Sequence, residues 1–312
     1  MASPGKVHAT GVVELEKQDP EIFTNNFSSE NFICQAQYCN LYHGKIPGGW
    51  KGLEGGDVTV KYELEFLQSP KATSSRYLLR LIALSRDDKS EFLGVVYDLR
   101  LSNTLRHFVD KVEFKWLERI KVAVGIARLL RYLIHEEPRY LVRDLSAAHI
   151  MLDKDWNPFL INYFKLDGVA MDSMQPEAHS DRMSFGSWGY IDIYYVNSGL
   201  CREYSDVFAF GVILCELLFK CKVEEHPGDG WVYIYNEAQE LYPLNTMLGV
   251  SFVDKSLKKD PHFKAPDGPK ISRLARLCVD LDPKIRPNME QVVKSLENLQ
   301  VVIDNVGTFT DI

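Results

Sequence analysis

The chain has 312 residues, of which 46% are hydrophobic and 25% are charged, a balance typical of a folded globular protein. That length is enough for two compact lobes. The formal net charge of -7 argues against a general nucleic-acid or anionic-membrane surface, which would need clustered Lys and Arg.

Residues 1–22 are polar and mixed, and we expect a flexible lead-in there. Four strands are predicted next, from apolar and β-branched runs bounded by Gly and Pro, with a Gly-rich turn over 46–56 between the first two. The predicted strands are 40–45, 57–62, 78–84 and 92–97. The amino-terminal half should therefore be small and rich in β-structure.

The second half of the chain is predicted to be helical. Apolar residues recur at spacings of three and four from Leu117 to Ile134, which marks one face of an amphipathic helix. A second helix is predicted to begin at Ser205, with its hydroxyl as the N-cap, and to run through Phe219. Two more are predicted over 271–280 and 289–299.

The cysteines and the apolar runs indicate in which cellular compartment the protein is expected. The six cysteines lack the paired spacing of a metal site, and a chain of this size needs no disulfide framework. The most apolar run, 207–219, is shorter than the roughly 18 residues that cross a bilayer and contains Glu216. We therefore expect a cytoplasmic protein without a transmembrane segment.

Two segments resemble the catalytic loop and the metal-binding loop of eukaryotic protein kinases, whose patterns are H-R-D-L-x-x-x-N and D-F-G. They read Val142-Arg143-Asp144-Leu145-Ser146-Ala147-Ala148-His149 and Asn162-Tyr163-Phe164. Collinear matches lie at 23–28, 152–158, 186–192, 205–212 and 282–287. Across 23–299 the chain resembles the plant receptor-like kinase family, in particular the pseudokinases that act as adaptors of plant immune receptors, and the wall-associated kinases.

This resemblance implies a bilobal α+β fold of the protein-kinase type. The small β-rich lobe would span about 23–98 and the larger helical lobe about 99–299, followed by a tail over 300–312. The expected activation segment contains Ser180 and Ser184, which we expect to face a partner and to be phosphorylated, or else to lie in an ordinary polar loop.

For nucleotide binding, Lys61 matches the strand Lys that pairs with phosphates and with a helix Glu in the family. Glu65 is the better candidate for that Glu and Glu63 the second, in a helix that must be shortened. The glycine positions of the family's phosphate-covering loop hold Cys34, Ala36 and Cys39. Side chains there crowd the ligand, so a plain hairpin without nucleotide is the competing interpretation.

For catalysis, Asp144 matches the family's base, which accepts the proton of the substrate hydroxyl, or it persists for structural hydrogen bonds alone. Ser146 stands where the family commonly has Lys. Asn162 and His149 replace the Asp and the Asn that hold the metal. An amide lacks the charge and an imidazole is a poor ligand for Mg²⁺, so no metal site is expected.

A further departure concerns a buried ion pair. The family's A-P-E reads Asp192-Ile193-Tyr194 here, so the Glu that pairs with the Arg matched by Arg286 is replaced by Tyr194. An unpaired buried charge is costly. We therefore expect Arg286 to bind either the Tyr194 hydroxyl or a backbone carbonyl.

The leading hypothesis is a pseudokinase that acts as an adaptor or scaffold in plant signalling or immunity. Its expected partners are an immune receptor or active kinases, not nucleic acid, and these partners would bring it to the plasma membrane. The alternatives are a weak ATP-dependent serine/threonine kinase that uses Lys61 and Asp144, and a sensor that binds ATP without transferring phosphate. No cofactor is certain: ATP stays open, and the altered ligands argue against Mg²⁺.

Overall fold

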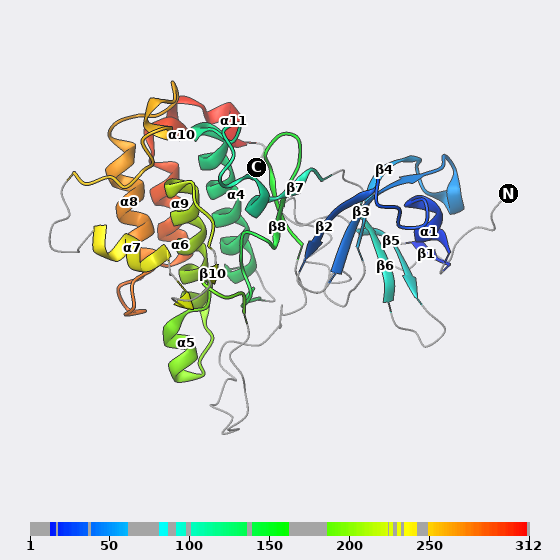
Figure 1. The fold of residues 1–312 in the computed structure, drawn as a ribbon, viewed down its shortest axis with the longest axis horizontal. Helices are drawn as coiled ribbons and strands as arrows, with labels where there is room; N and C mark the ends of the chain where they lie inside the picture. The colour runs from blue at the N-terminus through cyan, green and yellow to red at the C-terminus, as the bar shows by residue number, and fades with distance from the viewer. Residues whose placement is uncertain are drawn as a thin grey trace. The chain divides into compact units, whose positions relative to one another are not determined.

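The computed structural model describes residues 13–16, 18–36, 39–61, 81–86, 92–97, 101–135, 139–161, 186–223, 225–226, 230–231, 234–241 and 249–310. The chain forms two compact units (Figure 1). Unit 1 comprises Met1–Leu105 and Ala148–Phe164, and unit 2 comprises Arg106–Ala147 and Lys165–Ile312. The segment 148–164, predicted for the second lobe, thus belongs to the first unit.

Unit 1 is built around a six-stranded sheet with the order β1-β5-β6-β4-β3-β2. Its strands are β1 (Val13–Leu15), β2 (Phe32–Ala36), β3 (Cys39–Ile46), β4 (Gly56–Lys61), β5 (Leu81–Arg86) and β6 (Phe92–Tyr97). Neighbours pair antiparallel, except that β1 runs parallel to β5. The strands predicted over 40–45, 57–62 and 92–97 are confirmed within a residue or two, and the one predicted over 78–84 lies at Leu81–Arg86.

The prediction of a flexible lead-in is wrong for residues 13–22. This stretch contains β1 and the short helix α1 (Asp19–Phe23). Its apolar side chains enter the core cluster of the sheet, formed by Val13, Leu15, Phe23, Ile46, Val58, Ala83 and Val96. The buried Asp19 carboxylate accepts a hydrogen bond from Lys51 Nζ at 2.7 Å, which ties α1 to the 3-10 turn η1 (Trp50–Gly52). Three apolar residues within a polar stretch are enough to dock it.

A second, three-stranded sheet explains why 148–164 belongs to unit 1. It consists of β7 (Asn103–Thr104), β8 (Ile150–Leu152) and β9 (Pro158–Leu160), paired antiparallel in that order. The turn between β8 and β9 is held by Asp153, whose Oδ1 accepts the backbone N–H groups of Asp155 at 2.9 Å and Asn157 at 2.8 Å.

Unit 2 is mainly helical. Its larger helices are α4 (Trp116–His135), α6 (Glu203–Phe219), α7 (Ile234–Leu241), α8 (Asp267–Cys278) and α9 (Met289–Glu297). The shorter elements are α3 (Leu105–Phe108), α5 (Ile193–Ser198), η4 (Leu257–Lys259), α10 (Gln300–Asp304), α11 (Val306–Thr310) and the pair β10 (Glu225–His226) and β11 (Gly230–Trp231). Helix α4 packs against α9 and α6, and α6 packs against α8. The periodicity from Leu117 to Ile134 thus predicted α4 correctly.

Several helix boundaries differ from the predictions. Helix α6 begins at Glu203, not Ser205, and its N-cap is Arg202. Ser205 is the third helical residue. Its hydroxyl accepts the Arg202 N–H at 3.4 Å, as the N3 residue of a capping box does. Helix α8 begins at Asp267 instead of 271, and α9 ends at Glu297.

The predicted tail forms α10 and α11 over most of its length. The buried carboxylate of Asp267 accepts the first free N–H groups of α10, from Gln300 at 2.7 Å and Val301 at 2.9 Å. The Arg128 guanidinium of α4 bonds both Glu297 and the Phe309 carbonyl. Within the described residues, no helix has the length and hydropathy needed to cross a bilayer.

Candidate functional site

The catalytic-loop segment of unit 2 is held by a carboxylate of α6. Asp206 is buried, and its Oδ2 and Oδ1 accept the backbone N–H groups of Val142 at 2.7 Å and Arg143 at 2.8 Å. Arg143 has a φ of +59°, an uncommon conformation that these bonds help to maintain. Burial raises the pKa of Asp206 to about 6, and the two backbone hydrogen bonds partly oppose that rise.

Asp144, the residue at the catalytic-base position, is tied to the segment that precedes α5. Its Oδ1 accepts the backbone N–H of Ser187 at 2.7 Å and the Ser187 hydroxyl at 2.9 Å. The side chain is buried, with 2% of its surface exposed. One oxygen of the carboxylate is therefore engaged by two protein donors.

A small pocket lies beside Asp144 in unit 2. Its lining includes Arg143, Ser187, Tyr190 and Cys201. Burial raises the pKa of the Cys201 thiol to about 12, so this thiol stays protonated and is a poor nucleophile. The pocket lining thus combines the carboxylates of Asp144 and Asp192 with hydroxyl groups and a protonated thiol.

The buried Arg286 is paired with Asp192, not with Tyr194. Its Nη1 and Nη2 donate to the two Asp192 carboxylate oxygens, both at 2.8 Å, in a bidentate pair with no exposed side-chain surface. Backbone carbonyls of Asp280 at 2.7 Å and Tyr204 at 3.0 Å complete its hydrogen bonds. The expected carbonyl contacts are confirmed. The expected Tyr194 contact is wrong: Tyr194 makes an edge contact with the Tyr204 ring at 5.5 Å.

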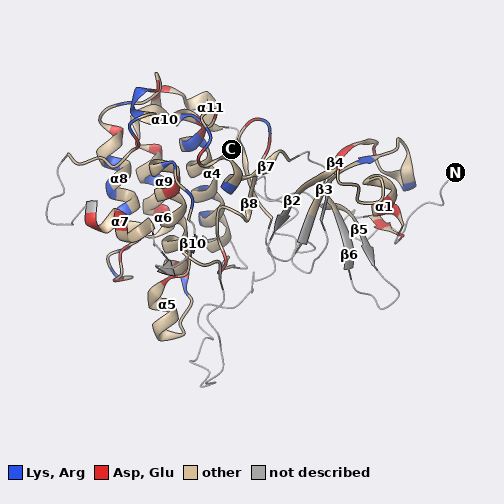
Figure 2. Ribbon diagram, in the orientation of Figure 1, with Lys and Arg blue, Asp and Glu red and all other residues tan. Residues whose placement is uncertain are grey.

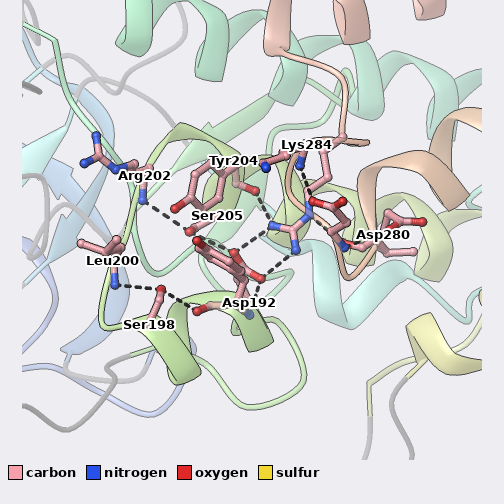
Figure 3. Close-up of polar contacts among 12 residues, drawn as sticks. Asp192, Ser198, Leu200, Arg202, Tyr204, Ser205, Asp280 and Lys284 are labelled. Atoms are coloured by element: carbon pink, nitrogen blue, oxygen red, sulfur yellow. Dashed lines mark hydrogen bonds and ion pairs between the residues drawn. The ribbon is translucent and has the colours of Figure 1, made fainter.

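Asp192 also organises the segments around this pair (Figure 3). Its Oδ1 accepts the Tyr194 N–H at 2.9 Å and so caps the amino-terminal end of α5, while its Oδ2 accepts the Ser205 hydroxyl at 3.1 Å. Sequence reasoning missed this residue. The available signal was an Asp directly before an apolar stretch, which is a common N-cap pattern.

The predicted nucleotide and metal residues are only partly described. Lys61 ends β4, where its backbone pairs with Leu41 of β3 and Val95 of β6, but its side chain lies outside the described part. Glu65 and Asn162 also lie outside it, as do Glu63, Ser180 and Ser184. The Lys61–Glu65 pair therefore stays a prediction.

The strands that flank the glycine-poor loop, and His149, which the sequence predicts at an altered metal position, lie in unit 1. Strands β2 and β3 form an antiparallel hairpin with Ala36 opposite Cys39. His149 is buried, with 1% of its surface exposed, and its carbonyl accepts the Ile161 N–H at 2.9 Å. Across the residues that the structure describes, no group of three or more His, Cys, Asp and Glu could hold a metal ion.

Ser146 replaces a family Lys. It is 1% exposed, and its hydroxyl has no hydrogen-bond partner among the described residues. A neutral hydroxyl at this position supplies no positive charge to a phosphate.

Comparisons with known proteins agree with this architecture. A family model described as protein tyrosine and serine/threonine kinase matches residues 60–296. The receptor-like cytosolic serine/threonine-protein kinase RBK2 of Arabidopsis thaliana is 30% identical over 301 residues, covering 89% of this chain and 60% of that protein. The LRR receptor kinase SERK2 of Oryza sativa subsp. japonica is 28% identical over 298 residues, covering 89% and 46%.

Among solved structures, the pseudokinase domain of BIR2, an immune regulator of the RLK/Pelle family, matches with a TM-score of 0.67 and 22% identity, over 93% of this chain and 89% of that chain. The chain spans about half the length of the curated relatives it matches. Because the family model covers most of the sequence, the chain belongs to the protein tyrosine and serine/threonine kinase family, with plant receptor-like cytosolic kinases among its relatives.

Proposed function

We propose that this protein is a pseudokinase, a kinase-fold module that works by binding other proteins. The observation that carries the proposal is the loss of both metal ligands, with His149 and Asn162 where the family has Asn and Asp. Phosphoryl transfer depends on Mg²⁺ to position and neutralise the phosphates. An imidazole and a neutral amide are weak replacements for hard, charged oxygen ligands.

The geometry around Asp144 supports the same proposal. One carboxylate oxygen already accepts two hydrogen bonds from Ser187, and the buried Ser146 hydroxyl stands where the family has a cation. That carboxylate oxygen is therefore already occupied by two protein donors and is not free to receive a substrate hydroxyl. Both features make phosphoryl transfer at this site less favourable and leave the fold unchanged.

The proposed role is that of an adaptor in the cytoplasm of a plant cell, brought to the plasma membrane by an immune receptor or an active kinase. This part rests on the resemblance to adaptor pseudokinases, and the description of BIR2 as a pseudokinase and immune regulator is in line with it. Positive and negative residues are interspersed along the described part of unit 2 (Figure 2), which favours protein partners over nucleic acid.

The alternative is a weak or atypical serine/threonine kinase. The retained Asp144 favours it, since Asp206 holds the backbone of this loop at Val142 and Arg143. Two relatives are also described as a serine/threonine kinase, RBK2, and a probable one, PBL9.

Phosphoryl transfer separates the two functions. The purified chain would be incubated with ATP and either Mg²⁺ or Mn²⁺, beside the variant Asp144→Asn. We expect no transfer above the level of the variant, because the metal ligands are missing. Transfer by the natural chain that disappears in Asp144→Asn would establish the kinase alternative.

Nucleotide binding is the second readout, and restoring the metal ligands provides the matched control. Without its ligands, the natural chain should show no Mg²⁺-dependent rise in melting temperature with ATP. The double variant His149→Asn, Asn162→Asp should gain one, since it regains both oxygen ligands. An ATP-induced rise in the natural chain without transfer would instead support the nucleotide-sensor alternative.

A further inference from the structure

A buried carboxylate in α6 lies at the centre of a hydrogen-bond network in unit 2. Glu216 has no exposed surface. Its Oε2 accepts the Tyr190 hydroxyl at 2.8 Å, and its Oε1 accepts the Val223 N–H at 2.8 Å. Tyr190 belongs to the segment before α5, and Val223 to the loop after α6.

The network extends to α3 and the catalytic loop. Arg106 donates from Nη1 to the Val223 carbonyl at 2.8 Å and from its backbone N–H to the Ala147 carbonyl at 2.9 Å. The Ala147 backbone also faces the Tyr190 hydroxyl closely enough to lower its pKa, although burial raises that pKa overall. The Glu216 network therefore consists of Arg106, Ala147, Tyr190, Glu216 and Val223.

Close packing joins this network to the catalytic-base position. Gly189 lies directly against Val223, and a Cβ at Gly189 would stand 2.2 Å from Val223 Cγ1. Two residues earlier, Ser187 donates both of its hydrogen bonds to Asp144. Release of Tyr190 from the Glu216 network would therefore loosen the segment that holds Asp144.

The Glu216 network holds its carboxylate without a counter-charge. Both hydrogen bonds to the carboxylate come from neutral donors. The two cations that face it from neighbouring elements bind elsewhere: Arg106 to the Val223 carbonyl and Lys222 to Asp110 at 2.8 Å. On its own helix, the adjacent Cys215 thiol is neutral, because burial raises its pKa. Keeping an ionised carboxylate in such a place is costly.

The cost of burial and the opposing hydrogen bonds together set the pKa of Glu216. Burial raises its pKa to about 7, although the hydrogen bonds from Val223 and Tyr190 and the charges of Arg106 and Lys222 oppose the rise. When the network opens and water reaches the carboxylate, the pKa returns to the ordinary value of about 4.3. The closed network thus binds the proton more tightly than the open one.

We propose that Glu216 is a proton-sensitive latch on residues 186–191: the Glu216 network is firmly closed while the carboxyl carries a proton and loosens when the proton is lost. Between the two titration points, each rise of one pH unit favours opening by up to about tenfold. The segment that contacts Asp144 is therefore held more tightly at pH 5.5 than at pH 7.5. The proposal stands whether or not the chain transfers phosphate.

Hydrogen exchange tests the latch in the full chain. Protection of the backbone amides in 186–191 and 221–223 would be measured from pH 5.5 to 8, after correction for intrinsic exchange rates. Protection should fall by more than about tenfold between pH 5.5 and 7.5. In Glu216→Gln the side chain stays neutral, so protection in these two segments should lose most of its pH dependence. Equal pH dependence in both proteins, or none in the natural chain, would overturn the proposal.

If Glu216→Gln does not fold, titration of Glu216 in the natural chain tests the proposal instead. Carbon-13 NMR of the Glu216 carboxyl in the natural chain should give a midpoint near 7, and a midpoint near the ordinary value for Glu would refute the latch. The variant Tyr190→Phe removes one hydrogen bond to the ionised form, so its midpoint should lie higher still.

Discussion

The carboxylate of Asp192 is a single group that joins three parts of unit 2. It pairs with Arg286, caps α5 through the Tyr194 N–H, and accepts the Ser205 hydroxyl of α6. The pair with Arg286 has no exposed side-chain surface, so both charges are removed from water. Such a pair adds little net stability compared with apolar residues, but breaking it leaves one buried charge without compensation.

Removal of this carboxylate should therefore be strongly destabilising. We expect Asp192→Ala to lower the free energy of unfolding by about 3–5 kcal/mol, measured by urea denaturation. Two control variants isolate the effect. Tyr194→Phe should leave stability nearly unchanged, because its hydroxyl does not bind Arg286. Lys264→Ala, which removes an exposed ion pair with Asp304, should cost much less. Equal losses for Asp192→Ala and Lys264→Ala would contradict this assignment.

The packing of α6 against α8 depends on a glycine in the middle of α6. A Cβ at Gly211 would stand 2.6 Å from Cys278 Cβ and 2.8 Å from Val279 Cγ1. Real Cβ atoms do not come that close, and the neighbours are the end of α8 and the residue after it. The helix accepts the lower helix propensity of glycine because only glycine permits this close approach.

Two of the helical glycines, Gly211 and Gly307, should thus respond in opposite ways to alanine. Gly211→Ala is expected to lower the free energy of unfolding by about 1–3 kcal/mol, since overpacking forces α6 and α8 apart. Gly307→Ala in α11 has open space around the new Cβ, and should raise it by about 0.5–1 kcal/mol through helix propensity. Urea denaturation measures both changes. Stabilisation by Gly211→Ala would show that α8 can move away without cost.

At the scale of the whole molecule, two buried carboxyl groups among the described residues have raised pKa values that affect stability between pH 4 and 7. Burial raises the pKa of Asp206 to about 6 and that of Glu216 to about 7. A group whose pKa is raised by folding binds its proton more tightly in the folded state. Its contribution is therefore fully present below the unfolded pKa and is lost as the pH rises through the folded value.

We accordingly expect the free energy of unfolding to fall as the pH rises from about 4.5 to 7. One pKa unit corresponds to about 1.4 kcal/mol, so each group contributes at most about 3 kcal/mol to that fall. Urea denaturation at pH 5, 6 and 7.5 measures it, and Glu216→Gln should remove roughly half of the slope. The exposed acid Asp110, whose pKa is lowered by Lys222, acts in the opposite sense at lower pH. Stability that rises steadily from pH 5 to 7.5 would contradict the prediction.

Regular periodicity made most of the fold predictable. The apolar spacing from Leu117 to Ile134 predicted α4, and alternating apolar runs predicted β3, β4 and β6. The elements at the two ends of the domain were missed for a different reason. Strand β1 needs β5 beside it, and α10 needs the Asp267 carboxylate for its first N–H groups. Short segments with few apolar residues carry no periodic signal, so only their partners make them regular.

The candidate site, too, has features that the sequence predicts and features that only tertiary contacts decide. The order of motifs in the sequence was enough to indicate the kinase family, while the loss of the metal ligands stays a prediction from His149 and Asn162. Hydrogen-bond partners far apart in the chain were decided by tertiary structure alone. Asp192 and Arg286 are 94 residues apart, Asp144 and Ser187 are 43 apart, and Tyr190 and Glu216 are 26 apart. Motifs identify residue types by local order, whereas a buried charge takes whichever partner the packed chain brings within 3 Å, as a hydrogen bond of about that length requires.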